Sequence, residues 1–427
     1  MMRHDDDVLK RVVDDFNTPL YLYDAASIVE QYRRATAAFP GVRVLYSAKA
    51  NPNLGVAKLL CSLGAGIEVA SSGEIRLCER AGFQGSEAIF VGPGKTCAEI
   101  ESAIRKGFQS IAAESMGELR SIQSVAASLA TRTRVMLRLN LATGIDSAVE
   151  QMIGGPSRFG FDEELLPDLI DLAAFPNIVF CGVHCYGGSQ ILDASAIARH
   201  IQLTSDAFAH LAGYFGEDFR VLDYGGGFGI PYAGDEHALS LEVVAAAMRR
   251  SRSWLEERTR RTIVPLIELG RYLVAESGTY LTRVVDVKRS RGRVFVICDG
   301  GMHQFLRPAF MHVRHGVSIV ARQPCHGEPE ELTICGRLCT PLDVLVSSAL
   351  LPVPAVGDIV AVHNAGAYGY TMSPLLFLGH AAPREILLCK EDAIALESPI
   401  LDPGPLTAAD ARHLDNFVQR IASSVRQ

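Results

Sequence analysis

The stretch RVLYSAKANPNLGVAKLLCSLGAGIEVASSGEIRLCERA, residues 43–81, contains the pattern that decides the fold. Two short runs of apolar and β-branched residues, Arg43–Ala48 and Gly66–Ala70, are typical of buried strands. Each is followed by a segment in which apolar residues recur at helical spacing, Leu54–Leu63 and Gly73–Ala81. A repeated order of strand and then helix predicts a parallel sheet whose strands are joined by helices.

Six further strand-like runs follow the first two, with helical patterns between them. They are Ala88–Val91, Ser110–Ala113, Arg134–Asn140, Val179–His184, Arg220–Tyr224 and Val264–Leu269. Eight strand-and-helix units in about 250 residues predict a (β/α)8 barrel. An open doubly wound sheet also alternates strands and helices, but the count of eight and the lack of a GxGxxG motif after the first strand favour the barrel.

The sequence changes in character after about residue 280. Runs that alternate or are rich in β-branched residues are separated by Gly and Pro without long helical patterns, which indicates an antiparallel β domain. The segment Thr18–Tyr23 is also strand-like, so we expect it to pair with this domain, and we expect an amphipathic helix over Ala408–Val425 to pack on the surface. The predicted domains are a barrel over residues 26–280 and a β domain formed by residues 1–25 and 281–427.

Composition and charge are those of a globular protein. The chain has 427 residues, 48% of them hydrophobic and 21% charged, with a formal net charge of −7. This balance excludes a disordered chain and argues against binding to nucleic acid. No apolar stretch reaches the ~18 residues of a membrane span, and the charged N-terminus lacks the apolar core of a secretory signal. The ten cysteines form no CxxC pair, so we expect reduced thiols, no metal site and a cytoplasmic location.

A lysine closes the first predicted strand, where barrel enzymes carry their chemistry. Lys49 lies in Tyr46–Asn51 (YSAKAN). Such a lysine is either a surface residue just past the strand or a functional amine, because a buried ammonium is costly unless it is paired or used. A functional lysine here would form a Schiff base, since desolvation frees its amine as a nucleophile.

Three other strand ends carry polar residues or glycines. Asp223–Gly229 (DYGGGFG) has four glycines in five positions, which suits the close approach of an anion such as phosphate, with a flexible turn as the alternative. Glu268–Arg271 (ELGR) offers a carboxylate, a glycine amide and a guanidinium, for a ligand or as an ion pair. His184–Gln190 (HCYGGSQ) supplies an aromatic side chain for stacking and a hydroxyl for phosphate.

These groups together fit pyridoxal 5′-phosphate (PLP) better than any other cofactor. PLP needs an amine for its aldehyde, a nest for its phosphate and a carboxylate for its pyridinium nitrogen. This inference depends on the order in which the lysine, the glycine-rich loop, the acid and the arginine follow the predicted strands, because none of the four is decisive alone.

The combination of motifs resembles the fold-type III PLP-dependent decarboxylases, the group of diaminopimelate, ornithine and arginine decarboxylases. The resemblance extends over roughly Thr18 to Gly379. It implies a barrel of the alanine racemase type, PLP as cofactor and a homodimer with shared active sites. The motifs are Tyr46–Asn51, Glu68–Glu74 (EVASSGE), Gly225–Gly229, Glu268–Arg271, Cys335–Cys339 (CGRLC) and Gly366–Gly369 (GAYG).

The resemblance also implies roles for individual residues. Lys49 is the Schiff-base lysine, Glu268 pairs with the pyridinium nitrogen, and Cys339 returns a proton to Cα from a loop that reaches the active site of the other subunit. The residues implied to hold the phosphate or to lie beside it are Gly225, Gly226, Gly227, Gly270, Arg271, Ser189 and Tyr368. Those implied to contact the substrate are Arg307, Thr340 and Tyr368.

Four positions depart from the family pattern, and one of them, Leu269 in place of the usual proline, is a small change. Where the family often has a second histidine that stacks on the cofactor ring, this chain has Tyr186, so Tyr186 or His184 could stack, and we favour Tyr186. The residue after the cysteine is acidic in the ornithine and diaminopimelate enzymes. Here it is Thr340, which cannot give the charge-assisted bond that a distal ammonium requires. Met311 replaces the tyrosine expected four residues after Arg307.

The sequence Cys339–Asp343 (CTPLD) is most similar to a subgroup from specialised metabolism. One member of it decarboxylates a glutamyl group carried on an acyl carrier protein. We therefore predict PLP-dependent decarboxylation of an acidic or carrier-bound L-amino acid in a biosynthetic pathway. The alternatives are a diaminopimelate decarboxylase and an amino-acid racemase. A non-catalytic cofactor carrier or a sugar-phosphate barrel enzyme would use only part of the motif set.

Overall fold

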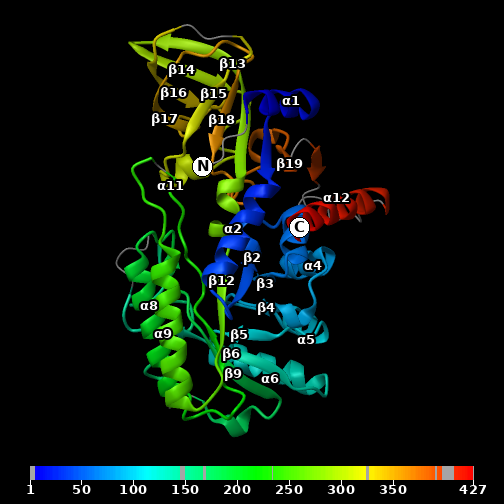
Figure 1. Ribbon diagram of the computed structural model, residues 1–427, viewed down its shortest axis with the longest axis vertical. Helices are drawn as coiled ribbons and strands as arrows, with labels where there is room; N and C mark the ends of the chain where they lie inside the picture. Colours follow the sequence, from blue (N-terminus) through cyan, green and yellow to red (C-terminus); the bar gives the residue numbers. More distant parts are fainter. Residues whose placement is uncertain are drawn as a thin grey trace.

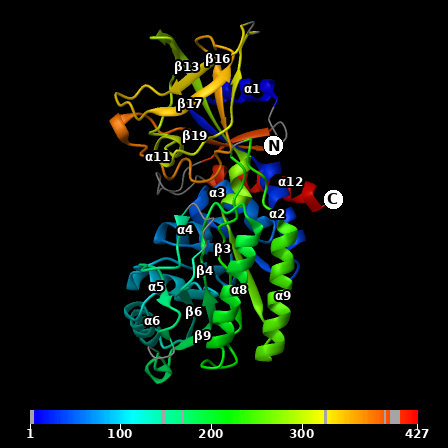
Figure 2. The same cartoon turned by 90° about the vertical axis from the view of Figure 1, so that its left-hand side faces the viewer.

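The chain folds into a barrel and a β-rich domain stacked end to end. The computed structural model describes residues 5–144, 150–166, 170–232, 234–323, 327–389, 392–396 and 408–426. In Figure 1 the barrel lies below and the β-rich domain above, and the N-terminal part of the chain, in blue, contributes to both. Figure 2 shows the same stacking after a quarter turn, with helices on the outside of the barrel.

The barrel contains the eight predicted parallel strands. They are β2 (Arg43–Ser47), β3 (Gly66–Val69), β4 (Ala88–Phe90), β5 (Ser110–Ala113), β6 (Thr133–Asn140), β9 (Ile178–His184), β11 (Val221–Asp223) and β12 (Val264–Leu269). Each pairs with the next in parallel, and β12 pairs with β2. The sheet therefore closes, which confirms the barrel and excludes the open sheet. The strand ends agree with the predicted ends to within one residue.

Helices that follow the strands cover the outside of the barrel. They are α2 (Ala25–Ala38), α3 (Leu54–Ser62), α4 (Ser72–Ala81), α5 (Cys97–Arg105), α6 (Met116–Ser128), α8 (Ala194–Leu211) and α9 (Leu241–Thr259). The short α10 (Arg271–Val274) follows β12 and is buried. Three of the outer helices begin with hydroxyl caps, because the side chains of Ser71, Thr96 and Ser115 each accept a backbone N–H from the first turn. A cap of this kind typically contributes about 1 kcal/mol and fixes where the helix begins after its strand.

Shorter elements complete the barrel half. The short strands are β7 (Glu150–Gln151), β8 (Phe161–Asp162) and β10 (Gly188–Ser189). The 3-10 turns of the chain are η1 (Ala48–Ala50), η2 (Gly85–Glu87), η3 (Leu172–Ala174), η4 (Ala275–Ser277) and η5 (Phe377–Gly379). Of these, η1 matters most for function, because it sets the position of Lys49 directly after β2.

The second domain is built on a strand from the N-terminus. The predicted strand there is β1 (Leu20–Asp24), which lies between β13 and β19, so its pairing with this domain is confirmed. Most pairs in the sheet are antiparallel, as predicted, but β1–β19 and β14–β16 are parallel. Long connections separate both of these pairs, so no tight turn forces them to be antiparallel. The other strands are β13 (Gly278–Ser290), β14 (Arg293–Cys298), β15 (Val317–Val320), β16 (Glu330–Cys335), β17 (Val344–Leu351), β18 (Ile359–His363), β19 (Arg384–Cys389) and β20 (Asp392–Leu396).

Three further helices lie outside the strand-and-helix units of the barrel. They are α1 (Asp6–Phe16), α11 (Arg307–Met311) and α12 (Ala408–Arg426). The predicted C-terminal helix, α12, lies against α3 on the outside of the barrel, where Lys58 pairs with Asp415 and Phe417 is buried. Among the described residues, no helix is long and apolar enough to cross a membrane.

Candidate active site

The carboxyl ends of the barrel strands converge on a cavity of about 340 Å³ beneath the β domain. Seven of the predicted site residues line it: Lys49, Tyr186, Ser189, Glu268, Arg271, Arg307 and Tyr368. Five of these lie at or just after the ends of three barrel strands, β2, β9 and β12, and the other two come from the β domain. The cavity therefore brings together functional side chains that are up to more than 300 residues apart in the sequence.

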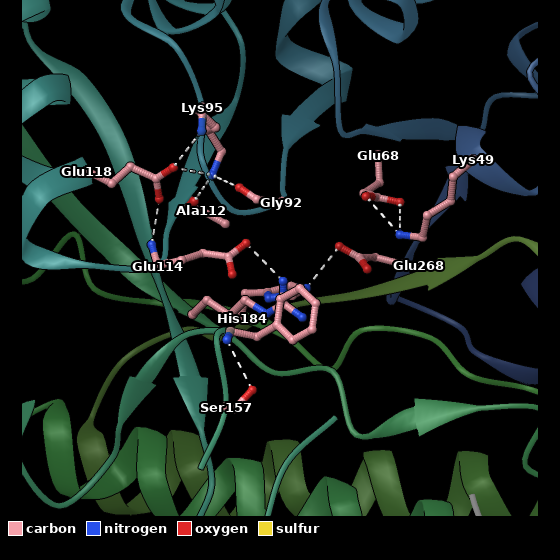
Figure 3. A network of polar contacts seen from close by, with 12 residues as sticks. Lys49, Glu68, Gly92, Lys95, Ala112, Glu114, Glu118, Ser157, His184 and Glu268 are labelled. Carbon is pink, nitrogen blue, oxygen red and sulfur yellow. Dashed lines mark hydrogen bonds and ion pairs between the residues drawn. The ribbon is translucent and has the colours of Figure 1, made fainter. Parts of the chain in front are cut away.

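Lys49 faces two carboxylates across this cavity (Figure 3). Its Nζ lies 3.0 and 2.9 Å from the two carboxylate oxygens of Glu68, which is buried on β3 and also accepts a hydrogen bond from Ser47. Burial alone would lower the pKa of the Lys49 amine, but Glu68 and Glu268 outweigh it and raise the pKa above its ordinary value. The amine is therefore held in place as an ammonium by Glu68.

Glu268 is the second carboxylate and is almost fully buried beside His184. Nε2 of His184 lies 3.2 Å from Oε1 of Glu268, and the exposed side-chain fractions are 1% and 2%. Burial raises the pKa of Glu268, but His184 and Lys49 together lower it, so that the net shift is downward. Asp223, at the end of β11, lies next to this pair and has its pKa raised by burial and by the Glu268 charge. Glu268 is thus the charged member of the two acids.

Polar donors gather at the side of the cavity next to the glycine-rich loop. The guanidinium of Arg271 donates to the hydroxyl of Tyr232 at 2.8 Å and to that of Ser189 at 3.0 Å. The same guanidinium lies 4.9 Å from the centre of the Tyr368 ring. Within the described part of the chain, no group accepts a hydrogen bond from the backbone amide of Gly226.

The glycines of this loop are required by close backbone contacts. A Cβ at Gly226 would lie 1.8 Å from the carbonyl oxygen of Glu268, and one at Gly227, where φ is +86°, would lie 2.1 Å from that of Gly188. A Cβ at Gly270 would lie 2.8 Å from that of Ala50. Because the glycines permit these close contacts, the loops after β9, β11 and β12 lie together. The backbone amides of these loops and the Arg271 side chain therefore surround one region.

Tyr186 and His184 occupy different places although they are two residues apart. The ring centre of Tyr186 lies 5.8 Å from Nζ of Lys49, on the wall of the cavity. The imidazole of His184 is turned toward Glu268 instead. Of the two, Tyr186 therefore faces the lysine, and His184 faces the acid.

The remaining predicted residues lie on the β domain, and only some reach the cavity. Arg307, at the start of α11, lies in the wall with its guanidinium 5.2 Å from the centre of the Tyr232 ring and 3.9 Å from the sulfur of Met311. Cys339 and Thr340 follow β16 and do not belong to the cavity wall of the same chain. One chain therefore does not bring Cys339 to Lys49.

Several wall residues had no role assigned from the sequence. Arg138 on β6 pairs with Glu114 at 2.9 Å and lies over the ring of Phe159 at 4.6 Å. Behind it, Lys95 is buried and donates to Glu118 at 3.1 Å, and Figure 3 shows this pair beside Glu114. Charged residues within apolar runs, such as Arg138 in RVMLRLN and Glu68 in GIEVA, are the signal that could have identified them.

Comparison with known proteins places this site in context. Residues 25–275 match the family described as "Pyridoxal-dependent decarboxylase, pyridoxal binding domain". An L-glutamyl-[BtrI acyl-carrier protein] decarboxylase from Niallia circulans is 38% identical over 384 residues, covering 87% of this chain and 89% of that protein. A diaminopimelate decarboxylase from Helicobacter pylori is 33% identical over 386 residues, covering 88% and 91%.

Solved structures give the same picture. The crystal structure of diaminopimelate decarboxylase from Helicobacter pylori complexed with L-lysine is similar with a TM-score of 0.83 at 28% identity, covering 96% of this chain and 99% of that one. A diaminopimelate decarboxylase from M. jannaschii in co-complex with L-lysine is similar with a TM-score of 0.82 at 27% identity, covering 94% and 95%.

Proposed function

The chain belongs to the family of pyridoxal-dependent decarboxylases, and on that premise we propose that it removes the α-carboxyl group of an acidic L-amino acid carried on an acyl carrier protein. It is a PLP-dependent enzyme, and what the proposal adds is the substrate and the role of each residue. The observation that carries the proposal is the charge of the cavity wall, which has arginines but no unpaired carboxylate among its described residues.

The residues present fit PLP. Glu268 is a buried carboxylate in the cavity wall whose pKa is lowered by His184 and Lys49, which suits the protonated ring nitrogen of the cofactor. The proposed phosphate site consists of Gly225, Gly226, Gly227, Gly270, Ser189, Arg271 and Tyr368. Lys49 would bind the aldehyde carbon and Tyr186 would lie against the ring. When bound, PLP accepts the electron pair that is released as the bond between Cα and the carboxylate breaks.

The protein's own groups hold and move the protons of the reaction. Glu268, whose pKa is lowered beside His184 and Lys49, remains a carboxylate and keeps the ring nitrogen protonated. Lys49 lies next to Glu68, which can take up a proton when the amine must become neutral. We assign the return of a proton to Cα to Cys339, on the loop after β16.

The cavity wall supports an acidic rather than a diamino substrate. Among its described residues the carboxylates are Glu68, paired with Lys49, and Glu268, beside His184. A distal ammonium would thus find no free carboxylate among the described residues of this wall, and it would face the Arg307 guanidinium. A carboxylate or acyl oxygen at the same place can accept a hydrogen bond from Arg307 instead.

The similarity to a glutamyl-carrier-protein decarboxylase supports a tethered form of this substrate. Decarboxylation removes the α-carboxyl group, so a carrier must be attached through the side-chain carboxyl group. The thioester carbonyl would then lie at the Arg307 end of the cavity, with Cα at the Lys49 end. Met311 stands where a tyrosine was expected, so this position offers a thioether in place of a hydroxyl group.

A substrate panel tests the proposal. We expect the γ-glutamyl thioester of an acyl carrier protein to be decarboxylated with a kcat/KM about 10- to 200-fold above that of meso-diaminopimelate, the discrimination expected from one lost charged hydrogen bond. Release of CO2 from both substrates, measured under the same conditions, gives the ratio. A kcat/KM for meso-diaminopimelate of about 10⁴ M⁻¹s⁻¹ or above, with no turnover of the thioester, would contradict the proposal.

Diaminopimelate decarboxylation is the second candidate, because Arg307 occupies the position expected to hold that substrate's distal carboxylate and several relatives carry that name. Thr340→Glu separates the two candidates. If diaminopimelate is the substrate of the wild-type enzyme, some other residue reads its distal amine and the substitution should change little. If the proposal is right, the added carboxylate should raise turnover of meso-diaminopimelate.

Glu268→Gln should bind PLP but decarboxylate poorly. The amide cannot keep the ring nitrogen protonated, and losing an interaction of this kind typically lowers turnover by about 10²-fold or more. Cofactor content, measured by visible absorbance, and kcat should be determined on the same preparation. Near-normal turnover would remove Glu268 from this role, whereas a parallel loss of cofactor would indicate a part in binding alone.

A further inference from the structure

Asp223 is a fully buried acid with no role in the chemistry described above. It ends β11, which lies between β9 and β12 in the barrel, and it is opposite His184 in the register of β9 and β11. One oxygen of Asp223, one oxygen of Glu268 and one ring nitrogen of His184 all lie within 4.8 Å of one another. The Asp223 side chain therefore lies beside the acid that we assign to the ring nitrogen of the cofactor.

The surroundings of Asp223 favour its protonated form. It faces the Glu268 carboxylate from β12 and His184 from β9, and Glu68 on β3 adds a second negative charge. Burial and the Glu268 charge raise the pKa of Asp223 well above its ordinary value. Two buried carboxyl groups this close resist being ionised together, and His184 and Lys49 stabilise the charge on Glu268. Asp223 is therefore the acid that keeps its proton and has an O–H group to donate.

The same side chain also holds the first glycine of the loop after β11. Oδ1 of Asp223 accepts a hydrogen bond from the backbone amide of Gly225 at 2.9 Å. The carbonyl oxygen of Gly225 in turn accepts a hydrogen bond from the backbone amide of Glu268 at 2.8 Å. A Cβ at Gly225, where φ is +64°, would lie 2.5 Å from the carbonyl oxygen of Cys185, so this position requires glycine. The Asp223 carboxyl group and the Glu268 backbone thus fix Gly225 from both sides.

We propose that Asp223 is a positioning residue that joins the two ends of the cofactor site. Its protonated carboxyl group donates a hydrogen bond to the Glu268 carboxylate, and its other oxygen holds the Gly225 amide at the start of the glycine-rich loop. The inference rests on the proposed function, because it takes Glu268 to serve the ring nitrogen and this loop to hold the phosphate. The two contacts need a neutral side chain with one donor and one acceptor, which an asparagine also offers.

Two substitutions at Asp223 separate its contacts from its charge. Asp223→Asn keeps the shape, an acceptor and a donor but cannot ionise, whereas Asp223→Ala removes both contacts. The first measured quantity is the ratio of the dissociation constants of pyridoxal and PLP from the apoenzyme, which isolates the phosphate end because pyridoxal lacks the phosphate. The second is kcat, which depends on the Glu268 end. Ser251→Ala is the matched control, because Ser251 is buried on α9, lies 2.7 Å from the hydroxyl of the adjacent residue Tyr224 and does not line the cavity.

Asp223→Ala should lower the preference for PLP over pyridoxal about tenfold and should also lower kcat. Asp223→Asn should keep both quantities close to those of the wild type, and Ser251→Ala should leave the preference unchanged.

Three results would overturn the inference. Asp223→Asn could lose as much as Asp223→Ala, which would show that the charge is required. Asp223→Ala could keep the wild-type values, or Ser251→Ala could lose as much preference as it does, which would assign the effect to a general loosening of the region. The asparagine variant has the same shape as the wild type, so its result tests the charge even if the alanine variant does not fold. An Arg271→Ala variant that keeps the wild-type preference would instead overturn the proposed phosphate site, and the Asp223 assignment with it.

Discussion

Replacing Lys49 by alanine should abolish decarboxylation, lowering turnover by a factor on the order of 10⁴ or more, as expected when a covalent catalyst loses its nucleophile. The reason is its position: it follows the first barrel strand and its Nζ is held 2.9 Å from Glu68, inside the cavity that Glu268, Tyr186 and Tyr368 also line. The alanine variant should also lose the visible absorbance that depends on a link between PLP and a lysine amine.

Two controls test the assignment. One distinguishes the loss of the Lys49 amine from the loss of its charge, and the other distinguishes Lys49 from the other lysines. Lys49→Arg keeps a cation beside Glu68 but offers no nucleophilic amine at neutral pH, so it should be as inactive as the alanine variant. Borohydride reduction of the wild-type protein, followed by digestion, should place the pyridoxyl label on the peptide that contains Lys49. A label on Lys95, the other lysine labelled in Figure 3, would make the assignment wrong.

The barrel could be predicted from sequence because its strands are buried on both faces. Such strands are continuous apolar runs, and Ser110–Ala113 and Val264–Leu269 were predicted with the bounds that the structure has. The cavity could be anticipated for the same reason, since parallel strands bring their carboxyl ends together. Lys49, Glu268 and Arg271 are adjacent in space because β2 and β12 are neighbours that close the barrel.

The pairing of charges could not be predicted in this way. Glu68 pairs with Lys49 because β3 lies next to β2 in a particular register, with Ser47 opposite Glu68. Arg138 on β6 reaches Glu114 across the neighbouring β5 strand end. These contacts depend on lateral register and side-chain direction, which local hydrophobic patterns do not encode. Local patterns do not place Cys339 either, which lies outside the cavity wall of its own chain.

Cys339→Ala should slow protonation at Cα more than it weakens substrate binding. A general acid typically contributes about 10²- to 10⁴-fold, so kcat should fall by that order while KM changes little. With the thiol gone, a proton delivered to C4′ of bound PLP instead, followed by hydrolysis with water, would leave an inactive aminated cofactor and a carbonyl product. Detection of that carbonyl product, alongside the fall in kcat, identifies the missing step. A loss of substrate binding with normal product would contradict it.

Mixed dimers then test whether Cys339 acts in the other subunit. Cys339 is exposed on the loop after β16, and in its own chain the cavity wall does not include it. Lys49→Ala and Cys339→Ala chains are each expected to be inactive. If the site is shared, a mixed dimer contains one site with both Lys49 and Cys339 intact, and activity should recover on mixing. Because random exchange makes half of the dimers mixed and each has one complete site of two, recovery should approach a quarter of the wild-type rate. No recovery after verified subunit exchange would show that each chain supplies its own proton donor, which would require the loop after β16 to move into its own cavity.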